Sequence, residues 1–197
     1  MSQAVQTHIQ TQLADICTQL ERNSFQVSEL VKNLLHYQLN LRLESDRWSI
    51  AECVAHLNLF SEAFLPIISE ACEQTRESGW VVDAPFKMDV IGRLLKYALE
   101  PPSKWKAVTT AAFEPLVVEP LEQVAPGFYE LQSDLICVLR SAANLNLNRI
   151  RIVSPLSNHV RYNLYSCFLI IAAHQRRHIW QAEQTRVALL ESELKRR

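Results

Sequence analysis

Three histidines stand at positions that could bring imidazole groups to one metal ion. His174 and His178 are four residues apart in a segment that we expect to form the last helix. Residues with this spacing lie about 40° apart around a helix, so both side chains share one face. A helical pair of this kind can direct two nitrogens at a single metal ion. The apolar residues expected on the same side of the helix are Leu164, Ile171, Ala182 and Leu189.

His56 has the same character in the second predicted helix. With 100° per residue, Cys53, Phe60 and Ile67 fall within about 60° of it, so His56 is expected to point inward. A lone inward histidine is more often a hydrogen-bonded core residue than a ligand, and helical pairs also arise by chance. Burying three imidazoles without partners would cost free energy, however, and a metal satisfies one nitrogen on each. We therefore predict a Zn²⁺, Ni²⁺ or Fe²⁺ site at His56, His174 and His178, with a metal-free polar network as the alternative.

Other polar residues near these histidines have competing interpretations. Glu52 lies one turn before His56 and could orient it or act as a base, but its position next to Ser49 favours a structural role. Gln181 lies between the two histidine directions on the last helix and could hydrogen-bond a ligand or a neighbouring helix. Arg177 could bind an anionic group of a substrate or form a surface ion pair. Cys53 is expected to be buried and inert, and Trp48 to serve in packing.

The elements that must position these residues are mostly helical. Ser49 and Glu52 form a capping box, which places the start of the second long helix at Ile50. The prolines between residues 101 and 126 indicate a long crossover that is not a second domain. We therefore predict one all-α domain over residues 1–197, a bundle of long helices with short extra elements in the crossover. The predicted helices cover residues 2–35, 50–77, 88–99, 127–145 and 157–194, with a short extended piece at 149–153.

Composition excludes several classes of function. The formal net charge is −1, so no general basic field would recruit nucleic acid or a membrane, and neither partner is expected. Only three glycines occur, which disfavours phosphate-binding loops. The five cysteines lack a CxxC pair and fit reduced, mostly buried thiols. With a polar N-terminus that has no signal-peptide pattern, the chain is expected to be cytoplasmic.

Several motifs resemble those of the DinB/YfiT-like superfamily. The run from Trp48 to Leu57 (WSIAECVAHL) resembles its WSxxExxxHL motif, and the run from His174 to Gln181 (HQRRHIWQ) resembles HxxRHxxQ. Two further segments, Glu100-Pro101-Pro102 and Phe113-Glu114-Pro115, resemble the PP…FxP crossover of DinB-type members. The matches run from about Leu30 to Arg186 in the family's order. One departure is Ser154-Pro155, where the family often has a His-Pro or similar polar pair.

The resemblance implies a fold, a metal site and a choice of activities. The implied fold is an up-down-down-up four-helix bundle, frequently a homodimer, with a metal held at His56, His174 and His178. Characterised relatives include thiol-dependent S-transferases, a mycothiol-dependent isomerase and metal-dependent hydrolases. We therefore expect a metal-dependent enzyme that acts on a small molecule, as a thiol S-transferase with a low-molecular-weight thiol or as a hydrolase. The alternative is a non-catalytic metal-binding or structural bundle that acts through a partner or a dimer interface.

Overall fold

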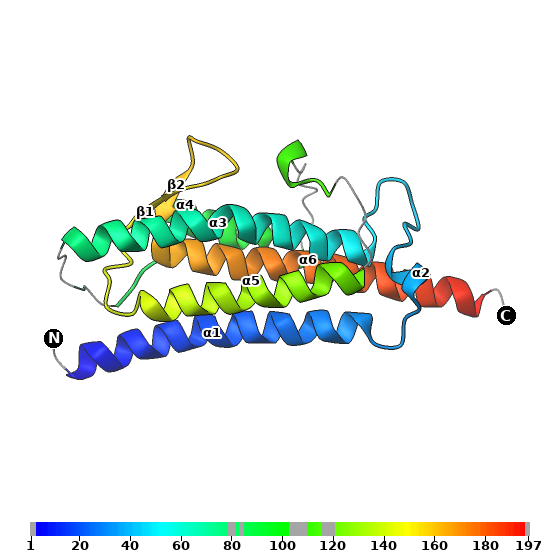
Figure 1. The fold of residues 1–197 in the computed structure, drawn as a ribbon, viewed down its shortest axis with the longest axis horizontal. Coiled ribbons are helices and arrows are strands. Elements are labelled where there is room, and N and C mark those ends of the chain that lie inside the picture. Colours follow the sequence, from blue (N-terminus) through cyan, green and yellow to red (C-terminus); the bar gives the residue numbers. More distant parts are fainter. Residues whose placement is uncertain (1–2, 79–81, 83–84, 103–109, 116–120, 196–197) are drawn as a thin grey trace.

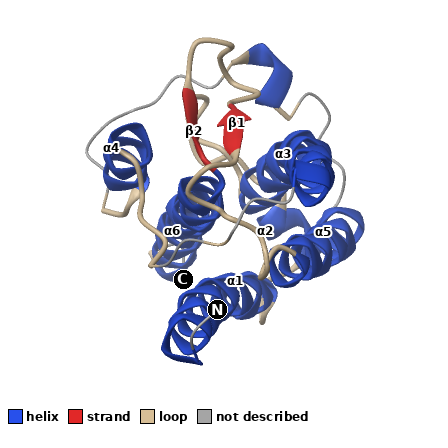
Figure 2. Ribbon diagram, turned by 90° about the vertical axis from the view of Figure 1, so that its left-hand side faces the viewer, coloured by secondary structure: helices blue, strands red, loops and turns tan. Residues whose placement is uncertain are grey.

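The computed structural model of the chain describes residues 3–78, 82, 85–102, 110–115 and 121–195. Four long helices lie side by side, and a short helix and a two-stranded hairpin flank them (Figures 1 and 2). Along α1 and α6 the colours of Figure 1 run in one direction, and along α3 and α5 they run in the other. The predicted all-α class is therefore confirmed for the described residues, apart from the hairpin. The elements are α1 Gln3–Val31, α2 His36–Leu39, α3 Ile50–Ser78, α4 Val90–Leu99, η1 Ala111–Phe113, α5 Leu121–Ser141, β1 Arg151–Val153, β2 Arg161–Asn163 and α6 Leu164–Leu194.

The first two long helices agree closely with their predictions. Helix α3 begins at Ile50 as the capping box predicts, because the Ser49 hydroxyl accepts from the Glu52 N–H at 3.1 Å and the Glu52 carboxylate accepts from the Ser49 N–H at 2.8 Å. Helix α1 ends earlier than predicted, at Val31. Asn33 follows with a φ of 61°, the left-handed conformation that often terminates a helix.

Two helix starts were predicted wrongly. Helix α5 begins at Leu121 and not at Gly127, so Pro126 lies inside the helix and not in the crossover. A proline costs the helix one backbone hydrogen bond, and packing of α5 against α1 and α3 outweighs that cost. Helix α6 begins at Leu164 and not at Ser157. The residues before Leu164 form strand β2, which pairs antiparallel with β1 over Arg151↔Asn163 to Val153↔Arg161.

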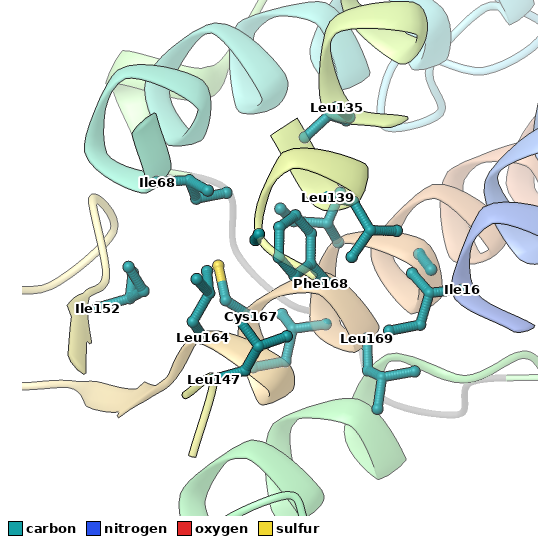
Figure 3. Packing of buried hydrophobic residues seen from close by; sticks show 14 of the residues in the cluster. Ile16, Ile68, Leu135, Leu139, Leu147, Ile152, Leu164, Cys167, Phe168 and Leu169 are labelled. Carbon is teal, nitrogen blue, oxygen red and sulfur yellow. The ribbon is translucent and has the colours of Figure 1, made fainter. Parts of the chain in front are cut away.

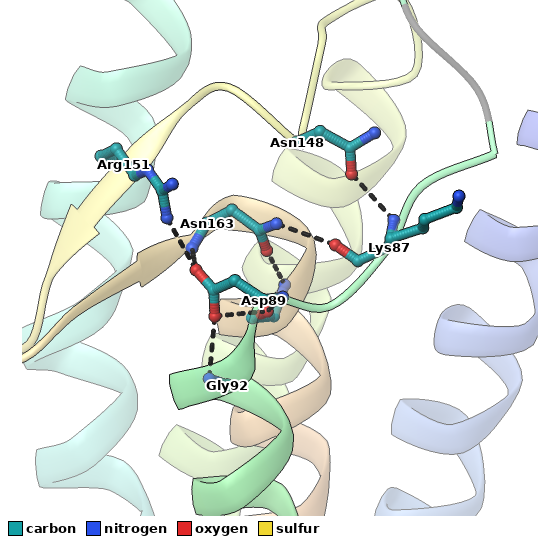
Figure 4. Close-up of polar contacts among 7 residues, drawn as sticks. Lys87, Asp89, Gly92, Asn148, Arg151 and Asn163 are labelled. Carbon is teal, nitrogen blue, oxygen red and sulfur yellow. Dashed lines mark hydrogen bonds and ion pairs between the residues drawn. The ribbon is translucent and has the colours of Figure 1, made fainter.

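A polar junction explains why α6 begins where it does. The Asn163 side chain accepts from the Ser166 N–H at 2.8 Å and donates to the Lys87 carbonyl at 2.8 Å, so it caps α6 and holds the chain that leads into α4 (Figure 4). Asp89 caps α4 through the Gly92 N–H and also accepts from the Asn163 N–H, each at 2.8 Å. The junction therefore fixes the starts of α4 and α6 together.

The core joins the long helices to the hairpin. Leu135 and Leu139 of α5 pack near Phe168 and Leu169 of α6, and Ile152 reaches the cluster from β1 (Figure 3). A second apolar cluster surrounds the beginning of α3 and the middle of α6. Burial of these apolar faces is the main source of stability for helices of this length.

Three buried amides set the register of α6 against its neighbours. Gln175 lies beside His174 in the sequence and is 1% exposed. Its side chain accepts from Asn23 of α1 at 2.9 Å and donates to Gln132 of α5 at 2.7 Å. Because a buried amide is costly when unpaired, this three-way contact favours one axial position of α6.

Helix α3 is long and apolar enough over Ile50–Glu77 to cross a membrane by length and composition alone. In the fold, 56% of that window is buried, and α3 packs against α5 and α6. A core helix of a soluble protein meets the same criterion. All five cysteines are free and four are buried, as predicted, and Cys137 is exposed.

Candidate metal centre

The connector before α3 contributes Arg42, a partly exposed residue that pairs with the buried Glu52 one turn before His56. Glu52 is 1% exposed, and its carboxylate receives hydrogen bonds from Arg42 Nε at 2.9 and 2.8 Å. Burial alone would raise the pKa of Glu52, but the hydrogen bonds from Arg42 and Ser49 outweigh burial and lower it. Glu52 therefore stays ionised while it anchors the first turn of α3, which agrees with the structural role predicted for it.

The three predicted histidines come together in the interior. His56 projects from α3, and His174 and His178 project from α6; they are 3%, 7% and 7% exposed. One candidate ligand atom from each residue lies within 4.8 Å of the other two. Nε2 of His56 and Nε2 of His174 lie 3.2 Å apart. Two nitrogens on one tetrahedral metal ion are separated by about this distance, given metal–nitrogen bonds of about 2.0–2.1 Å.

A main-chain carbonyl fixes the orientation of His56. Nδ1 of His56 donates to the carbonyl oxygen of Phe113 at 2.7 Å, since a carbonyl can only accept. In the neutral ring this leaves the lone pair on Nε2, which faces His174. The short helix η1 in the crossover therefore selects the tautomer in which His56 can bind a metal through Nε2.

Aromatic rings cover the histidine cluster on two sides. The Trp48 ring stacks on His178 with centroids 5.7 Å apart and also contacts His56 at 4.9 Å. Phe60 stacks on His174 with centroids 3.8 Å apart and planes inclined by 17°. These contacts restrict rotation of the imidazoles and keep water from their faces.

Burial favours neutral imidazoles throughout the cluster. Burial lowers the pKa of His56, against a raising contribution from its hydrogen bond to Phe113. The pKa values of His174 and His178 lie well below the usual range, mainly through burial and also because of neighbouring positive charge, including that of Arg177. A metal ligand must be a neutral imidazole, so this environment prepares all three rings for coordination without protonation.

Two nitrogens in the cluster lack a hydrogen bond. Nδ1 of His174 and Nδ1 of His178 are both buried, and neither has a hydrogen-bond partner among the described residues. Unpaired buried nitrogens cost free energy, and a bound cation would use nitrogen lone pairs of these rings. Three neutral nitrogen donors suit Zn²⁺, Ni²⁺ or Fe²⁺ better than Mg²⁺ or Ca²⁺, which prefer oxygen. The residues present therefore fit a divalent transition-metal ion.

The other predicted site residues lie at the edge of the cluster on α6. Gln181 is partly exposed, and its hydrogen bond to the His178 ring opposes the lowering of that pKa. Arg177 is also partly buried and donates to the carbonyl of Ala98 at the end of α4, at 3.4 Å. Burial lowers the pKa of Arg177. Both positions are close to His174 and His178 on α6, and their roles toward a substrate or metal stay predictions.

Several contacts of the site were not predicted. Trp48 was expected to serve in packing, and its ring stacks on His178, one of the three candidate metal ligands. The Phe113 carbonyl could not have been found from residue types, because every residue carries a carbonyl. Arg42 as the partner of Glu52 gave no signal in the sequence either. Cys53 is buried with a raised pKa caused by burial, in agreement with its predicted inert role.

Comparison with known proteins identifies one family. A family model described as DinB superfamily matches residues 19–182, which include all three histidines. No curated protein and no solved structure matches the chain.

Proposed function

The chain belongs to the DinB superfamily, and on this premise we propose that it is a divalent-metal-dependent enzyme whose ion is held by His56, His174 and His178. The observation that carries the proposal is the meeting of three buried imidazoles with ligand atoms within 4.8 Å of one another. A site with three protein ligands leaves positions open for a substrate or water, as catalytic zinc sites do.

The chemistry would come from the ion and the positioning from the chain. When bound, a divalent ion would lower the pKa of a thiol or a water molecule, or polarise a carbonyl group. The Phe113 carbonyl would hold a proton on Nδ1 of His56, so that Nε2 stays free to coordinate. Trp48 and Phe60 would limit the access of bulk water. Gln181 would orient His178, and Arg177 would attract an anionic group of the substrate.

We propose a small-molecule substrate and one of two reactions. In a thiol S-transferase, a low-molecular-weight thiol would lose its proton and attack an electrophilic carbon, and the bond from that carbon to its leaving group would break. In a hydrolase, water would attack the carbonyl carbon of an amide or ester, and the C–N or C–O bond would break to release an amine or an alcohol. The positive charge of Arg177 near the histidines supports a substrate that carries a negative charge. Both reactions need the same neutral imidazole ligands. They would differ in the molecule that takes the open coordination positions, a thiol in one case and water in the other.

Membership of the DinB superfamily also leads to proposals about architecture. We propose that the chain is a single domain with the up-down-down-up four-helix bundle of its family, which is supported by the opposed directions of α1 and α6 against α3 and α5 (Figure 1). We further propose a cytoplasmic location, and a homodimer as the assembly. Metal binding at the three histidines requires neither the cytoplasmic location nor the homodimer.

A specific observation favours a second candidate, a non-catalytic metal-binding bundle. The three histidines are at most 7% exposed, and η1 and two aromatic rings pack on them. Structural metal sites are closed in this way, whereas catalytic sites keep an accessible position. In this role the metal would stabilise the fold, and the chain would act through a partner or dimer surface.

Both candidate functions require that the three histidines bind a metal ion, and metal analysis of protein purified without an affinity tag tests this. We expect about one equivalent of a transition metal, and a loss of at least about tenfold in affinity when His174 is replaced by alanine. Turnover of a panel of thiol acceptors, amides or esters that stops on chelation and returns with metal would favour the enzyme. A large metal-dependent gain in melting temperature without turnover would favour the structural role. Metal well below one equivalent, unchanged by added Zn²⁺ or Ni²⁺, would contradict both.

A further inference from the structure

Helix α4 exposes an apolar face to solvent. Val90, Leu94 and Tyr97 follow the spacing i, i+4, i+7, which places them on one side of the helix. Their exposed fractions are 70%, 68% and 82%, and Ile91 beside them is 45% exposed. A surface helix normally turns such residues toward the core, so this side of α4 has the inverse of the usual pattern.

Helix α4 cannot turn this face inward, because its opposite side is already in use. Gly92 packs so closely on α6 that a Cβ atom there would lie 2.3 Å from the Cβ of Ser166. Leu95 and Leu99, on the same inner side, pack against the core. Asp89 anchors the first turn through the Gly92 N–H and through the N–H of Asn163 in β2. The rotation of α4 about its axis is therefore fixed with the apolar face outward.

Basic residues lie on α4 beside this face and at the N-terminal end of the helix. Arg151 of β1 binds the Asp89 carboxylate at 2.7 Å, which places the hairpin at the N-terminal end of α4 (Figure 4). Asp89 and Glu100, the carboxylates at the two ends of α4, are both paired with cations. No acidic residue occurs anywhere from 135 to 182 in the sequence. The exposed basic side chains of α4 and the hairpin region are Lys87, Arg93, Arg149, Arg151 and Arg161.

We propose that α4 and the β1–β2 hairpin dock on an anionic membrane surface. In this arrangement Val90, Leu94 and Tyr97 enter the boundary between headgroups and acyl chains, and the nearby arginines contact lipid phosphates. Tyrosine suits this depth because its ring is apolar and its hydroxyl is polar. The apolar face of α4 consists of four exposed side chains, a small area for binding through apolar contacts alone. Attachment therefore requires both the apolar face and anionic lipid.

The charge beside this face and the position of the described hollow favour a lipid over a protein partner. Helix α4 lies at the edge of the molecule (Figure 2), and its exposed apolar residues are open to solvent. A hollow of about 440 Å³ lies elsewhere, against α1 and α5, where Glu21, Tyr129 and Arg140 are among the lining residues. An exposed apolar helix face beside exposed cations matches a negatively charged lipid surface better than it matches a peptide that needs a groove.

This proposal departs from the expectation drawn from the net charge. A formal charge of −1 averages over the whole chain and disfavours membrane binding. The fold brings Arg151 of the hairpin to the N-terminal end of α4, so the total charge of the chain does not describe the charge of this surface. The proposal does not depend on the metal site, which lies between α3 and α6.

Vesicle flotation of the full-length protein tests the proposal. We expect the protein to float with vesicles of phosphatidylglycerol and phosphatidylcholine in equal parts, and not with phosphatidylcholine alone. Replacing Leu94 with glutamate should reduce the bound fraction by about tenfold, because it removes apolar contact and adds a repelled charge. Arg93→Glu should have a similar effect. Both side chains are exposed, so neither change disturbs the core.

Matched substitutions on α1 provide the controls. Phe25 is 63% exposed and Arg22 is exposed, so Phe25→Glu and Arg22→Glu make the same chemical changes away from α4. Both variants should float like the unaltered protein. Equal flotation with the two kinds of vesicle would overturn the proposal. So would a loss of bound protein in the α1 variants as large as that in the α4 variants. So would a homodimer in solution that Leu94→Glu dissociates, or capture of an acidic protein by this face without vesicle binding.

Discussion

Nε2 of His56 and Nε2 of His174 face each other at 3.2 Å, although 118 positions separate the two residues in the chain. Helix α3 holds one ring and α6 the other, and the carbonyl of Phe113 directs the lone pair of His56 toward the gap. The meeting of two neutral rings at this distance makes the interface between α3 and α6 sensitive to metal, to pH and to the register of the helices.

Metal should stabilise the fold through the histidines. At a free metal concentration a hundredfold above the dissociation constant, we expect the free energy of unfolding to rise by about 2.7 kcal/mol. A His178→Ala variant should lose most of this gain, and melting temperatures with Zn²⁺ and with chelator would measure it. His159→Ala serves as the control because His159 is exposed on the hairpin. An equal gain in His178→Ala and the unaltered protein would mean that metal binds elsewhere.

Without metal, the free energy of unfolding should fall as the pH is lowered from 6.5 toward the folded-state pKa values of the three histidines. The pKa values of His56, His174 and His178 lie below 6.5 in the folded state, so between those values and 6.5 the unfolded chain binds more protons. Each histidine that stays neutral then costs up to about 1.4 kcal/mol per pH unit. Urea unfolding in the presence of chelator at a series of pH values would measure this slope. His174→Gln should flatten the slope, and an unchanged slope would show that other groups cause it.

The pair of Arg42 and Glu52 should contribute measurably to folding. Replacing Glu52 with glutamine removes the charge that receives the Arg42 hydrogen bonds and weakens the capping box, so we expect a loss of about 1–3 kcal/mol. Since the pKa of Glu52 is lowered, its stabilising effect is present above the usual value of 4.5 and disappears as the pH falls through the folded value. Chemical denaturation at neutral and acid pH would test both statements. Glu44→Gln is the control, because the pair of Glu44 with Arg47 is exposed and contributes little.

Gly92 should be intolerant of a side chain. Alanine there would place its Cβ 2.3 Å from Ser166, so α4 must move away from α6 at a cost of about 1–3 kcal/mol. Gly127→Ala is a matched control within α5, where the nearest atom is the Asn58 side-chain nitrogen at 3.3 Å, and alanine there should be neutral or stabilising. Thermal unfolding of both variants would measure whether only Gly92→Ala lowers the melting temperature. A second change, Ser166→Gly, should recover part of the loss in Gly92→Ala, and no recovery would contradict the proposed clash.

The sequence predicted the parts of the site that depend on local periodicity. The capping box located the start of α3, and the spacing of apolar residues placed His56, His174 and His178 on inward faces. The starts of α5 and α6 could not be predicted in the same way, because they depend on contacts between distant segments. Pro126 is accepted inside α5 because the helix packs on α1 and α3, and α6 begins late because Asn163 is tied to Lys87. The Phe113 carbonyl depends on where the crossover lies, which side-chain patterns do not encode.

The amides of Asn23, Gln132 and Gln175 affect which substitutions the candidate metal site could tolerate during evolution. An apolar interface would allow α6 to slide by a turn with little penalty, whereas these amides leave donors without acceptors in any other register. They therefore hold His174 opposite His56 without touching either ring. Drift at these three positions could therefore separate the three histidines of the candidate metal site while every histidine remains in the sequence. A histidine triad read from a related sequence is thus an incomplete guide to whether that relative still has the site.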